Sequence, residues 1–295
     1  MFNINRFAEI QANPSRFRLL EQIPFSAEDH YPVKLRETVG DEIALALLDF
    51  ETTGFTAGTD EVIEIGLVQV AYSPSLERIT EIIEITSQLE CPKQTISELI
   101  TSITGISNEM VAGKRIDNTH VARIVNSSSV LIAHNAQFDR AFFDIRFPDM
   151  ADRLWACSVK DIDWRTHGFE SAKLEYLLLK NGYFYDAHRA ATDCLAIVQL
   201  FESVPNALPE LLANAQKASF KILAKGVSYP DREVVKKRGY RWDGDNRHWW
   251  TIVSEDAYAE ETAFLNALCG TAAAKNVFEK ISSSSRYIVN SDCKS

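Results

Sequence analysis

Acidic residues and a histidine occur in three separated motifs of this chain. The motifs are Asp49-Phe-Glu51-Thr-Thr-Gly54, His134-Asn135-Ala-Gln-Phe-Asp139 and His188-Arg-Ala190-Ala-Thr-Asp193. In the first motif, Asp49 and Glu51 end an apolar run and stand two positions apart, so an extended strand points both carboxylates to the same side. Two neighbouring anions repel each other unless a cation lies between them. This spacing predicts a binding site for divalent cations.

Two more carboxylates, Asp139 and Asp193, fall early in helical patterns far along the chain, and only folding brings them to Asp49 and Glu51. Four carboxylates together are the oxygen ligands that Mg²⁺ and Mn²⁺ prefer. Two such ions, roughly 3.5 to 4 Å apart, activate a water, stabilise the nonbridging oxygens and assist the departing 3′-oxygen in phosphodiester hydrolysis. We therefore expect a two-metal site with Mg²⁺ or Mn²⁺ as cofactors.

The segments expected to position these residues alternate between the hydrophobic pattern of a strand and that of a helix. Short links between the first three strands favour antiparallel neighbours, and a β-α-β-α order follows, which predicts a mixed α/β sheet. Strands are expected over residues 43–50, 62–71, 79–86, 130–133 and 154–157. Helices are expected over residues 16–22, 96–104, 119–126, 137–145, 174–180 and 190–201. Five residues on a helix subtend roughly 140°, so His188 must precede the helix that carries Asp193.

The ordered motifs D-x-E-T-T-G, H-N-A-x-F-D and H-x-A-x-x-D, with Ile103-Thr-Gly105-Ile106 between the first two, cover roughly residues 41–203. This segment resembles the DEDDh family of 3′-to-5′ exonucleases, which includes the proofreading epsilon subunit of bacterial replicative polymerase. The resemblance implies a ribonuclease-H-like fold, a mixed sheet flanked by helices. Each motif alone is more often a solvated surface feature, and their joint occurrence in order reverses that balance.

The resemblance also implies roles for individual residues. Asp49 would bridge both metals, Glu51 and Asp193 would complete one coordination sphere, and Asp139 would hold the other ion. His188 would be the general base, because an imidazole with an ordinary pKa of about 6.5 accepts a proton at neutral pH. Residues that follow Glu51 directly line the terminal-nucleotide pocket in the family, and a second-motif residue could orient a helix or touch the sugar. The substrate-binding candidates are Thr52, Thr53, Gly54, Phe55 and Asn135.

Composition limits the class of protein. The 295 residues have room for one sizeable domain and a small one, and the net charge of −10 requires any phosphate affinity to come from local patches or bound metal. Five scattered cysteines without C-x-x-C spacing argue against a disulfide scaffold and a zinc site. The start has no apolar signal region and no segment reaches the roughly 20 apolar residues that span a bilayer. We expect a cytoplasmic protein with no membrane partner.

The pattern divides the chain into five parts: an N-terminal extension over residues 1–40, an exonuclease-like domain over 41–205, a linker over 206–218, a small α+β domain over 219–270 and a tail over 271–295. The small domain combines cations with aromatics. Lys236, Lys237, Arg238, Arg241 and one tryptophan could bind unpaired bases and phosphates. Alternatively, Tyr240 and Trp242 form its core, and Trp249 and Trp250 must face opposite sides.

The sequence is compatible with three functions. The first is a metal-dependent 3′-to-5′ exonuclease that releases nucleoside monophosphates from single-stranded DNA. The second is an exoribonuclease of the same family, because the motifs do not show contacts to the 2′ position that separate RNA from DNA. The third is a noncatalytic subunit that binds nucleic acid or a polymerase.

Overall fold

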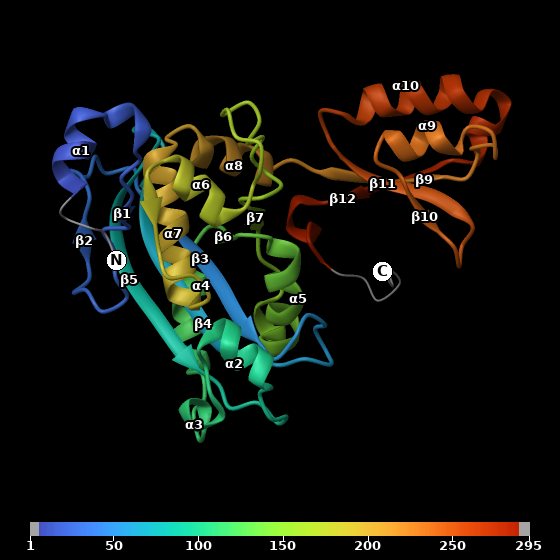
Figure 1. Ribbon diagram of the computed structural model, residues 1–295. Coiled ribbons are helices and arrows are strands. Elements are labelled where there is room, and N and C mark those ends of the chain that lie inside the picture. Colours follow the sequence, from blue (N-terminus) through green and yellow to red (C-terminus); the bar gives the residue numbers. More distant parts are fainter. Residues whose placement is uncertain (1–5, 289–295) are drawn as a thin grey trace.

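The computed structural model describes residues 6–288 (Figure 1). We call the part built on a six-stranded sheet the large domain and the part built on a four-stranded sheet the small domain. The large sheet has the strand order β2-β5-β4-β3-β6-β7, in which β3 is antiparallel to β4 and parallel to β6. Its strands are β2 (Val33–Lys34), β3 (Ile43–Thr52), β4 (Val62–Ser73), β5 (Arg78–Leu89), β6 (Leu131–Ala133) and β7 (Trp155–Cys157). The mixed α/β fold expected from the sequence is confirmed.

Alternation along β3 assigns its side chains to two layers. Leu45 and Leu47 belong to one buried cluster, which contains residues of α6 (Leu174–Lys180), α7 (Ala190–Ser203) and α8 (Ala207–Ala215). Leu48 and Phe50 belong to a second cluster, which contains residues of α4 (Asn118–Ser127) and α5 (Ala136–Arg146). Since side chains alternate in a strand, Asp49 and Glu51 continue the face covered by α7. The large domain thus has helices on both faces of its sheet.

Short elements join the sheet to these layers. After β5, the chain forms α2 (Glu98–Thr104) and α3 (Asn108–Val111). The side chain of Ser97 accepts a hydrogen bond from the Ile100 amide at the start of α2, and Gly105 ends that helix with a left-handed φ of 72°. Three-residue 3₁₀ turns lie at Pro148–Met150 and Ser283–Ser285.

The N-terminal segment packs on the large domain but not as the sequence predicts. The helix expected over residues 16–22 is wrong: α1 is Phe7–Ala12, a 3₁₀ turn follows at Pro14–Arg16, and β1 (Glu21–Gln22) pairs in parallel with β8 (Tyr183–Phe184). The backbone amides at both ends of β1 bond to the β8 segment, and Ile23 enters the core. These long-range contacts outweigh the weak local helical pattern.

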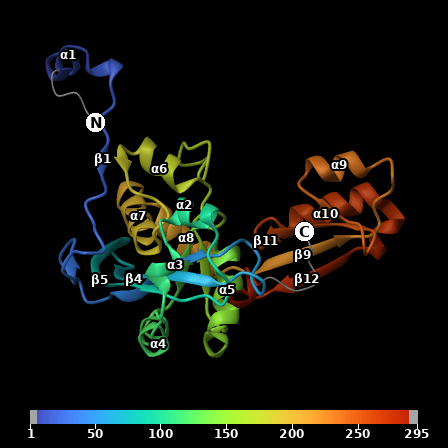
Figure 2. The same cartoon turned by 60° about the horizontal axis from the view of Figure 1, so that its bottom comes forward.

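The small domain is a four-stranded antiparallel sheet with two helices on one face (Figure 2). Its strand order is β10-β11-β9-β12, with β9 (Ser219–Ala224), β10 (Arg241–Asp243), β11 (His248–Ser254) and β12 (Val277–Ile281). The helices are α9 (Arg232–Lys237) and α10 (Tyr258–Cys269), and a 3₁₀ segment, Gly270–Lys275, leads to β12. The hairpin expected over residues 240–253 is confirmed in β10 and β11.

Two expected segment boundaries differ from the structure. Residues 206–218, predicted as a linker, contain α8, whose Leu208 and Leu211 are buried in the core of the large domain. The predicted tail over residues 271–295 contains β12, which pairs with β9 along five residues, and residues 289–295 lie outside the described part of the chain. In both places the apolar positions find partners distant in sequence.

The predicted aromatic core of the small domain is half right. Tyr240 is buried and its hydroxyl donates to Glu261 Oε1 (2.9 Å), but Trp242 is 52% exposed. Trp242 stands opposite Trp249 and its ring packs edge-on against the Trp249 ring (5.5 Å between centroids), so it shares the core face but lies on the edge strand β10, which leaves it open to solvent. Trp249 packs into the core whereas Trp250 lines a pocket on the other face, as predicted.

The chain returns to the large domain after β12. The buried guanidinium of Arg140 donates to the carbonyls of Ser284 and Arg286 (2.7 and 2.6 Å), and Arg286 pairs with the buried carboxylate of Asp161. The Tyr287 hydroxyl donates to the same carboxylate (2.8 Å). We call residues 284–287 the C-terminal clasp. In the described part of the chain, no helix has the length and apolar content needed to cross a bilayer.

Candidate active site

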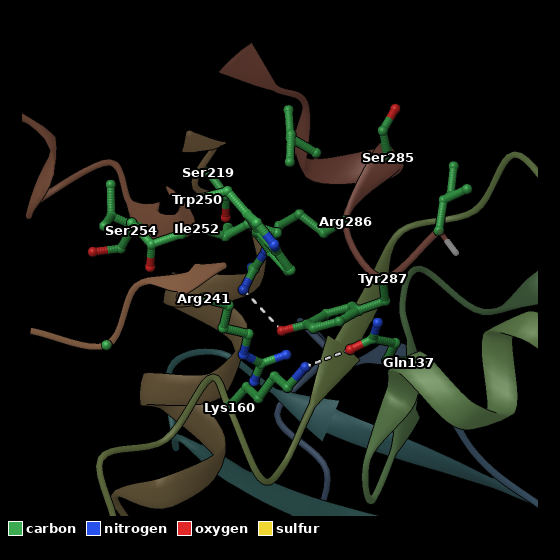
Figure 3. A pocket seen from close by; sticks show the side chains of 15 residues that line it. Gln137, Lys160, Ser219, Arg241, Trp250, Ile252, Ser254, Ser285, Arg286 and Tyr287 are labelled. Atoms are coloured by element: carbon green, nitrogen blue, oxygen red, sulfur yellow. Dashed lines mark hydrogen bonds between the residues drawn. The ribbon is translucent and has the colours of Figure 1, made fainter. Parts of the chain in front are cut away.

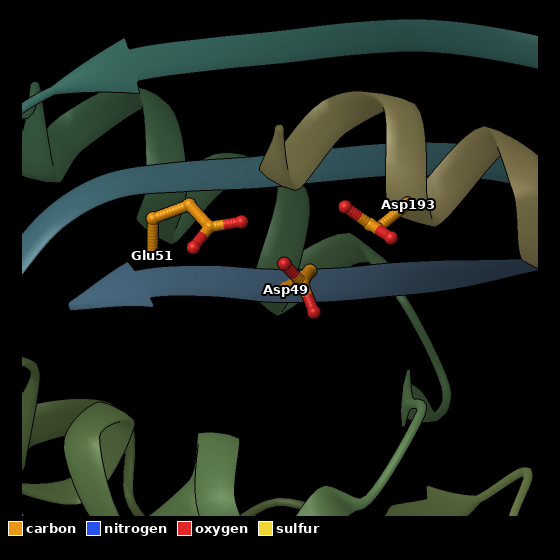
Figure 4. Close-up of side chains that lie close together, drawn as sticks. All are labelled: Asp49, Glu51 and Asp193. Carbon is orange, nitrogen blue, oxygen red and sulfur yellow. The ribbon is translucent and has the colours of Figure 1, made fainter. Parts of the chain in front are cut away.

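Three of the predicted acidic residues meet where β3 approaches the beginning of α7. Asp49, Glu51 and Asp193 each offer a carboxylate oxygen within 4.8 Å of the others. Figure 4 shows the Glu51 and Asp193 carboxylates directed toward each other beside the strand that carries Asp49. Because Asp49 and Glu51 share a strand face, α7 completes the cluster from above that face.

The fourth carboxylate, Asp139, reaches the cluster from the opposite layer. It lies in the first turn of α5, is 1% exposed, and accepts a hydrogen bond from the Phe50 amide (3.2 Å). That amide lies between Asp49 and Glu51 in sequence. After burial, the charge of Asp139 is the largest cause that raises the pKa of Asp49. Four carboxylates therefore share one region, although Asp139 lies outside the tight group of three.

Burial and mutual repulsion raise the pKa values of these carboxyl groups. Burial, followed by the charge of Asp193, raises the pKa of Glu51 to about 8, and burial raises that of Asp193 to about 6. Burial also raises the pKa values of Asp49 and Asp139 well above their usual range. Positive charge between the carboxylates would reverse these shifts. This donor set of hard oxygen ligands fits Mg²⁺ or Mn²⁺.

His188 lies on the loop before α7, as its spacing from Asp193 predicts. It has a φ of 70°, and its amide donates to Asp193 Oδ2 (3.0 Å), as does the amide of Arg189 (3.2 Å). The His188 side chain is exposed, and its charge lowers the pKa of Asp193 against the effect of burial. An accessible imidazole therefore stands beside the acidic cluster.

Comparisons with known proteins agree with this geometry. Residues 47–201 match the family model described as exonuclease, RNase T. The chain belongs to this exonuclease family. Its large domain is similar to part of the PolC-type DNA polymerase III of Thermotoga maritima, at 31% identity over 179 residues. The match covers 56% of this chain and 12% of that polymerase. A second PolC-type polymerase, from Clostridium perfringens, is 30% identical over 50% of this chain and 10% of its own length.

One solved structure supports the fold of the large domain. A structure of exonuclease I aligns with a TM-score of 0.50 at 14% identity, covering 79% of this chain and 69% of that one. Exonuclease X in complex with 5′ overhanging duplex DNA is 24% identical with a TM-score of 0.41, over 56% of this chain and 99% of that one. The first alignment is consistent with the ribonuclease-H-like architecture of the large domain. The chain spans only about an eighth of the length of the curated polymerase relatives.

The acidic residues of the large domain, which we also call the exonuclease domain, are oriented by contacts that the sequence did not reveal. The Tyr185 hydroxyl donates to Asp193 Oδ1 (2.9 Å) from the loop before α7. Fully buried Glu64 of β4 accepts from the Arg189 guanidinium (2.9 Å) and from the Ala190 amide (3.2 Å). The two hydrogen bonds to Glu64 hold the beginning of α7 against the sheet. Tyr185 lies only eight residues from Asp193, but nothing in its pattern distinguishes it from a core tyrosine.

Gly66 allows α7 to lie directly on β4. In the sheet register it stands opposite Asp49, and a Cβ at this position would collide with the backbone of Ala190 and Ala191. The small residues Ala190 and Ala191 at the beginning of α7 thus have Gly66 on the strand as their partner. The distance between Asp49 and Asp193 therefore depends on a missing side chain.

The predicted substrate-binding residues surround the loop that follows β3. Thr52 donates to the Gly54 carbonyl (2.5 Å), and Thr53 Oγ1 accepts from the Glu61 amide (2.9 Å). A Cβ on Gly54 would collide with the Asp60 carboxylate, so this glycine serves a close contact. Phe55 is 85% exposed, which leaves its ring free to contact a base.

Asn135 and His134 lie together at the end of β6. Asn135 is exposed and caps α5 with a left-handed φ of 82°. His134 bonds through Nδ1 to Ser158 Oγ (2.8 Å), and burial lowers its pKa to about 4. These contacts give His134 a structural role, while Asn135 stays available to orient α5 or touch a sugar.

Proposed function

We propose that this chain is a 3′-to-5′ exonuclease that releases nucleoside monophosphates from single-stranded DNA ends with two divalent cations. The proposal is carried by the convergence of carboxylate oxygens of Asp49, Glu51 and Asp193 within 4.8 Å. Asp139 joins them through the hydrogen bond that it accepts from the amide of Phe50. The family match supports hydrolysis, and the DNA polymerase relatives favour DNA over RNA. They also make a polymerase a candidate partner.

The cations would be held by Asp49, Glu51, Asp139 and Asp193. When bound, they would supply charge stabilisation for the phosphate oxygens and activation of the attacking water. The chain itself contributes fixed ligand positions: Tyr185 and two backbone amides orient Asp193, and the Phe50 amide orients Asp139. Preorganised ligands avoid a reorganisation cost at the moment of reaction.

His188 takes the proton of the attacking water in this proposal. Its side chain is exposed on a loop whose backbone is fixed by Asp193, so the imidazole can reach the solvent side of the cluster. An imidazole accepts a proton near neutral pH and releases it to solvent afterwards. On the other side, exposed Phe55 and the Thr52–Gly54 segment would contact the terminal nucleotide.

The test uses purified protein of residues 1–295 with 5′-labelled single-stranded DNA or RNA, Mg²⁺ or Mn²⁺, and an EDTA control. We expect a ladder of products that shorten from the 3′ end of DNA. Asp49→Asn should reduce the rate at least about 1,000-fold, because metal-based stabilisation is worth several kcal/mol. Shortening of RNA alone would favour the exoribonuclease. Binding without cleavage in either metal would favour the noncatalytic subunit.

A further inference from the structure

A cavity of about 400 Å³ lies between the two domains and is lined by both of them. The exonuclease domain contributes Gln137 and Lys160, and the small domain contributes Arg241, Trp250 and Ile252. The clasp residues Arg286 and Tyr287 complete the wall. Figure 3 shows the Arg241 and Lys160 side chains entering this space together. Its volume is in the range of small-ligand pockets.

The lining is basic on a protein whose net charge is −10. Among the described residues that line the cavity, three are cations and none is acidic. Arg286 is neutralised by Asp161. Within residues 6–288, Lys160 donates to the neutral Gln137 (2.8 Å) and forms no ion pair, and Arg241 lies over the Trp250 ring (5.6 Å to its centroid). Two positive charges therefore remain for an anionic ligand.

The aromatic lining results from the exposed face of the small sheet. Helices α9 and α10 cover the face that carries Trp249 and Val253, so Trp250 and Ile252 point to the uncovered face. Trp250 is half-buried and Ile252 is 52% exposed. Aromatic rings on an uncovered strand face, next to cations, are the arrangement that stacks unpaired bases.

The cavity belongs to the same edge of the large sheet as the acidic cluster. Strands β3, β6 and β7 are parallel neighbours, so their carboxyl ends share one edge. Asp49 and Glu51 lie at this end of β3, and Lys160 follows β7. Neighbouring strands are about 4.8 Å apart, which places the β7 end on the order of 10 Å from the β3 end. A single strand whose terminus lies at the cluster reaches the cavity within a few nucleotides.

We propose that this cavity binds an upstream nucleotide of the single strand, with Lys160 and Arg241 on its phosphate and Trp250 stacked on its base. This inference rests on the proposed function, because the strand enters from the cluster where its end is cleaved. The small domain then lengthens the substrate-binding track. We also expect the protein to bind long substrates more tightly than short ones, because a dinucleotide at the acidic cluster does not reach the cavity.

The test measures DNA binding and chemistry separately in the full chain. Binding of a labelled oligothymidylate of about twelve nucleotides is followed by fluorescence anisotropy in EDTA over a range of salt concentrations. We expect Trp250→Ala to raise Kd about tenfold and Trp250→Phe to retain most of the affinity. Arg241→Gln should raise Kd and reduce the salt slope by about 0.7, the change expected for one lost phosphate contact on a single strand.

Arg232→Gln is the matched control, because it removes the same charge from α9, on the covered side of the sheet. Hydrolysis of the p-nitrophenyl ester of thymidine 5′-monophosphate reports chemistry that does not need the cavity, and it should be unchanged in all four variants. Unchanged Kd and salt slope in Arg241→Gln and Trp250→Ala would overturn the inference even if the ester is hydrolysed. Weakened binding in a protein that hydrolyses neither ester nor DNA would support the cavity and overturn the exonuclease proposal.

Discussion

The two sheets of this protein differ in how many of their faces are covered. The large sheet has helices on both faces, and every residue of β4 is buried. The small sheet has helices on one face, and β11 alternates between core residues and residues such as Ile252 that remain exposed. A sheet covered on both faces can expose functional side chains only at the ends of its strands. A sheet covered on one face can also bind a ligand on its open face.

The two regions also treat charge in opposite ways. The strand ends of the large sheet collect carboxylates whose repulsion and burial raise their pKa values. The open face and the clasp collect cations beside aromatic rings. The first arrangement suits cations and the second suits an anionic polymer. An acidic protein can therefore act on nucleic acid because its charges are segregated.

Among substitutions outside the four carboxylates, that of Gly66 should have the largest effect, and the effect should be confined to the large sheet. In Gly66→Ala, the new Cβ meets the backbone of α7 and moves Asp193 away from Asp49. We expect a loss of about 100-fold in kcat, because a displacement near 1 Å is that costly, and a loss of about 1 to 3 kcal/mol of stability. Rates of ester hydrolysis and urea unfolding measure the two effects.

The matched control is Gly244→Ala in the small-domain hairpin. There the nearest atom to an added Cβ is a tryptophan side-chain nitrogen at 3.8 Å, an ordinary contact. Activity and stability should hardly change. Equal losses in both variants would mean that the close packing of α7 on β4 has no special role.

A rise in pH should destabilise the metal-free folded chain through the acidic cluster, and Mg²⁺ binding at the same cluster should stabilise it. The pKa of Glu51 is raised by burial to about 8 in the folded chain from 4.5, so the stability from its protonated form is complete below pH 4.5 and is lost as pH rises through 8. The Tm of the metal-free protein should fall between pH 5 and pH 8. Mg²⁺ at 100 times its Kd should restore about 2.7 kcal/mol at the upper pH.

Asp49→Asn provides the control for this prediction. The variant removes one of the repelling carboxylates, so its metal-free Tm at pH 8 should exceed that of the parent and should respond little to Mg²⁺. Calorimetry at both pH values measures the difference. A Mg²⁺ response in the variant as large as that of the parent would contradict a cation site at this cluster.

Breaking the clasp should weaken the connection between the two regions. Arg286→Gln leaves the buried Asp161 carboxylate without its cation, although the Cys157 amide and the Tyr287 hydroxyl still donate to it. We expect a loss of about 2 kcal/mol in the free energy of unfolding. Urea titration measures it, and the exposed Arg247→Gln serves as the control. If both variants unfold at the same urea concentration, the ion pair does not stabilise the clasp.

The smallest effect is expected for a residue that acts through a metal ligand. Tyr185→Phe removes the hydroxyl that donates to Asp193 and should raise the Mg²⁺ concentration for half-maximal rate about tenfold, as losses of such supporting contacts do. Tyr176→Phe, whose hydroxyl accepts only a long bond from the Glu170 amide (3.3 Å), is the control. A change in kcat with no change in Mg²⁺ dependence would argue against this positioning role.

Much of the large domain could be predicted from the sequence because local pattern and tertiary packing agree there. The alternation that directs Asp49 and Glu51 to one side is local, and the spacing of His188 from Asp193 already excludes a shared helix. Residues that support the site from outside the three motifs were missed. Gly66, Glu64 and Tyr185 act through contacts with α7 or the loop before it, which only the folded chain defines.

The same reason explains the errors outside the site. Two prolines and an alanine-rich stretch suggested a connecting helix or linker, and the helix α8 that forms there packs into the core. Serines near the end suggested a loose tail, but β12 pairs with β9 in that region. Arg238 was a candidate for nucleic-acid contact but pairs with Glu260 and Glu261 of α10. Whether a cation is free or neutralised depends on neighbours across the fold.

The clasp makes the order of synthesis matter. Arg140, a residue of the exonuclease domain that is 1% exposed, satisfies part of its guanidinium with carbonyls from residues 284 and 286. During translation, the large domain emerges first. Until the clasp has been made, its Arg140 guanidinium lacks these two carbonyls and its Asp161 carboxylate lacks Arg286 and Tyr287. Completion of the small domain is thus built into the maturation of the nuclease, and a nascent chain interrupted before the clasp lacks part of its interior.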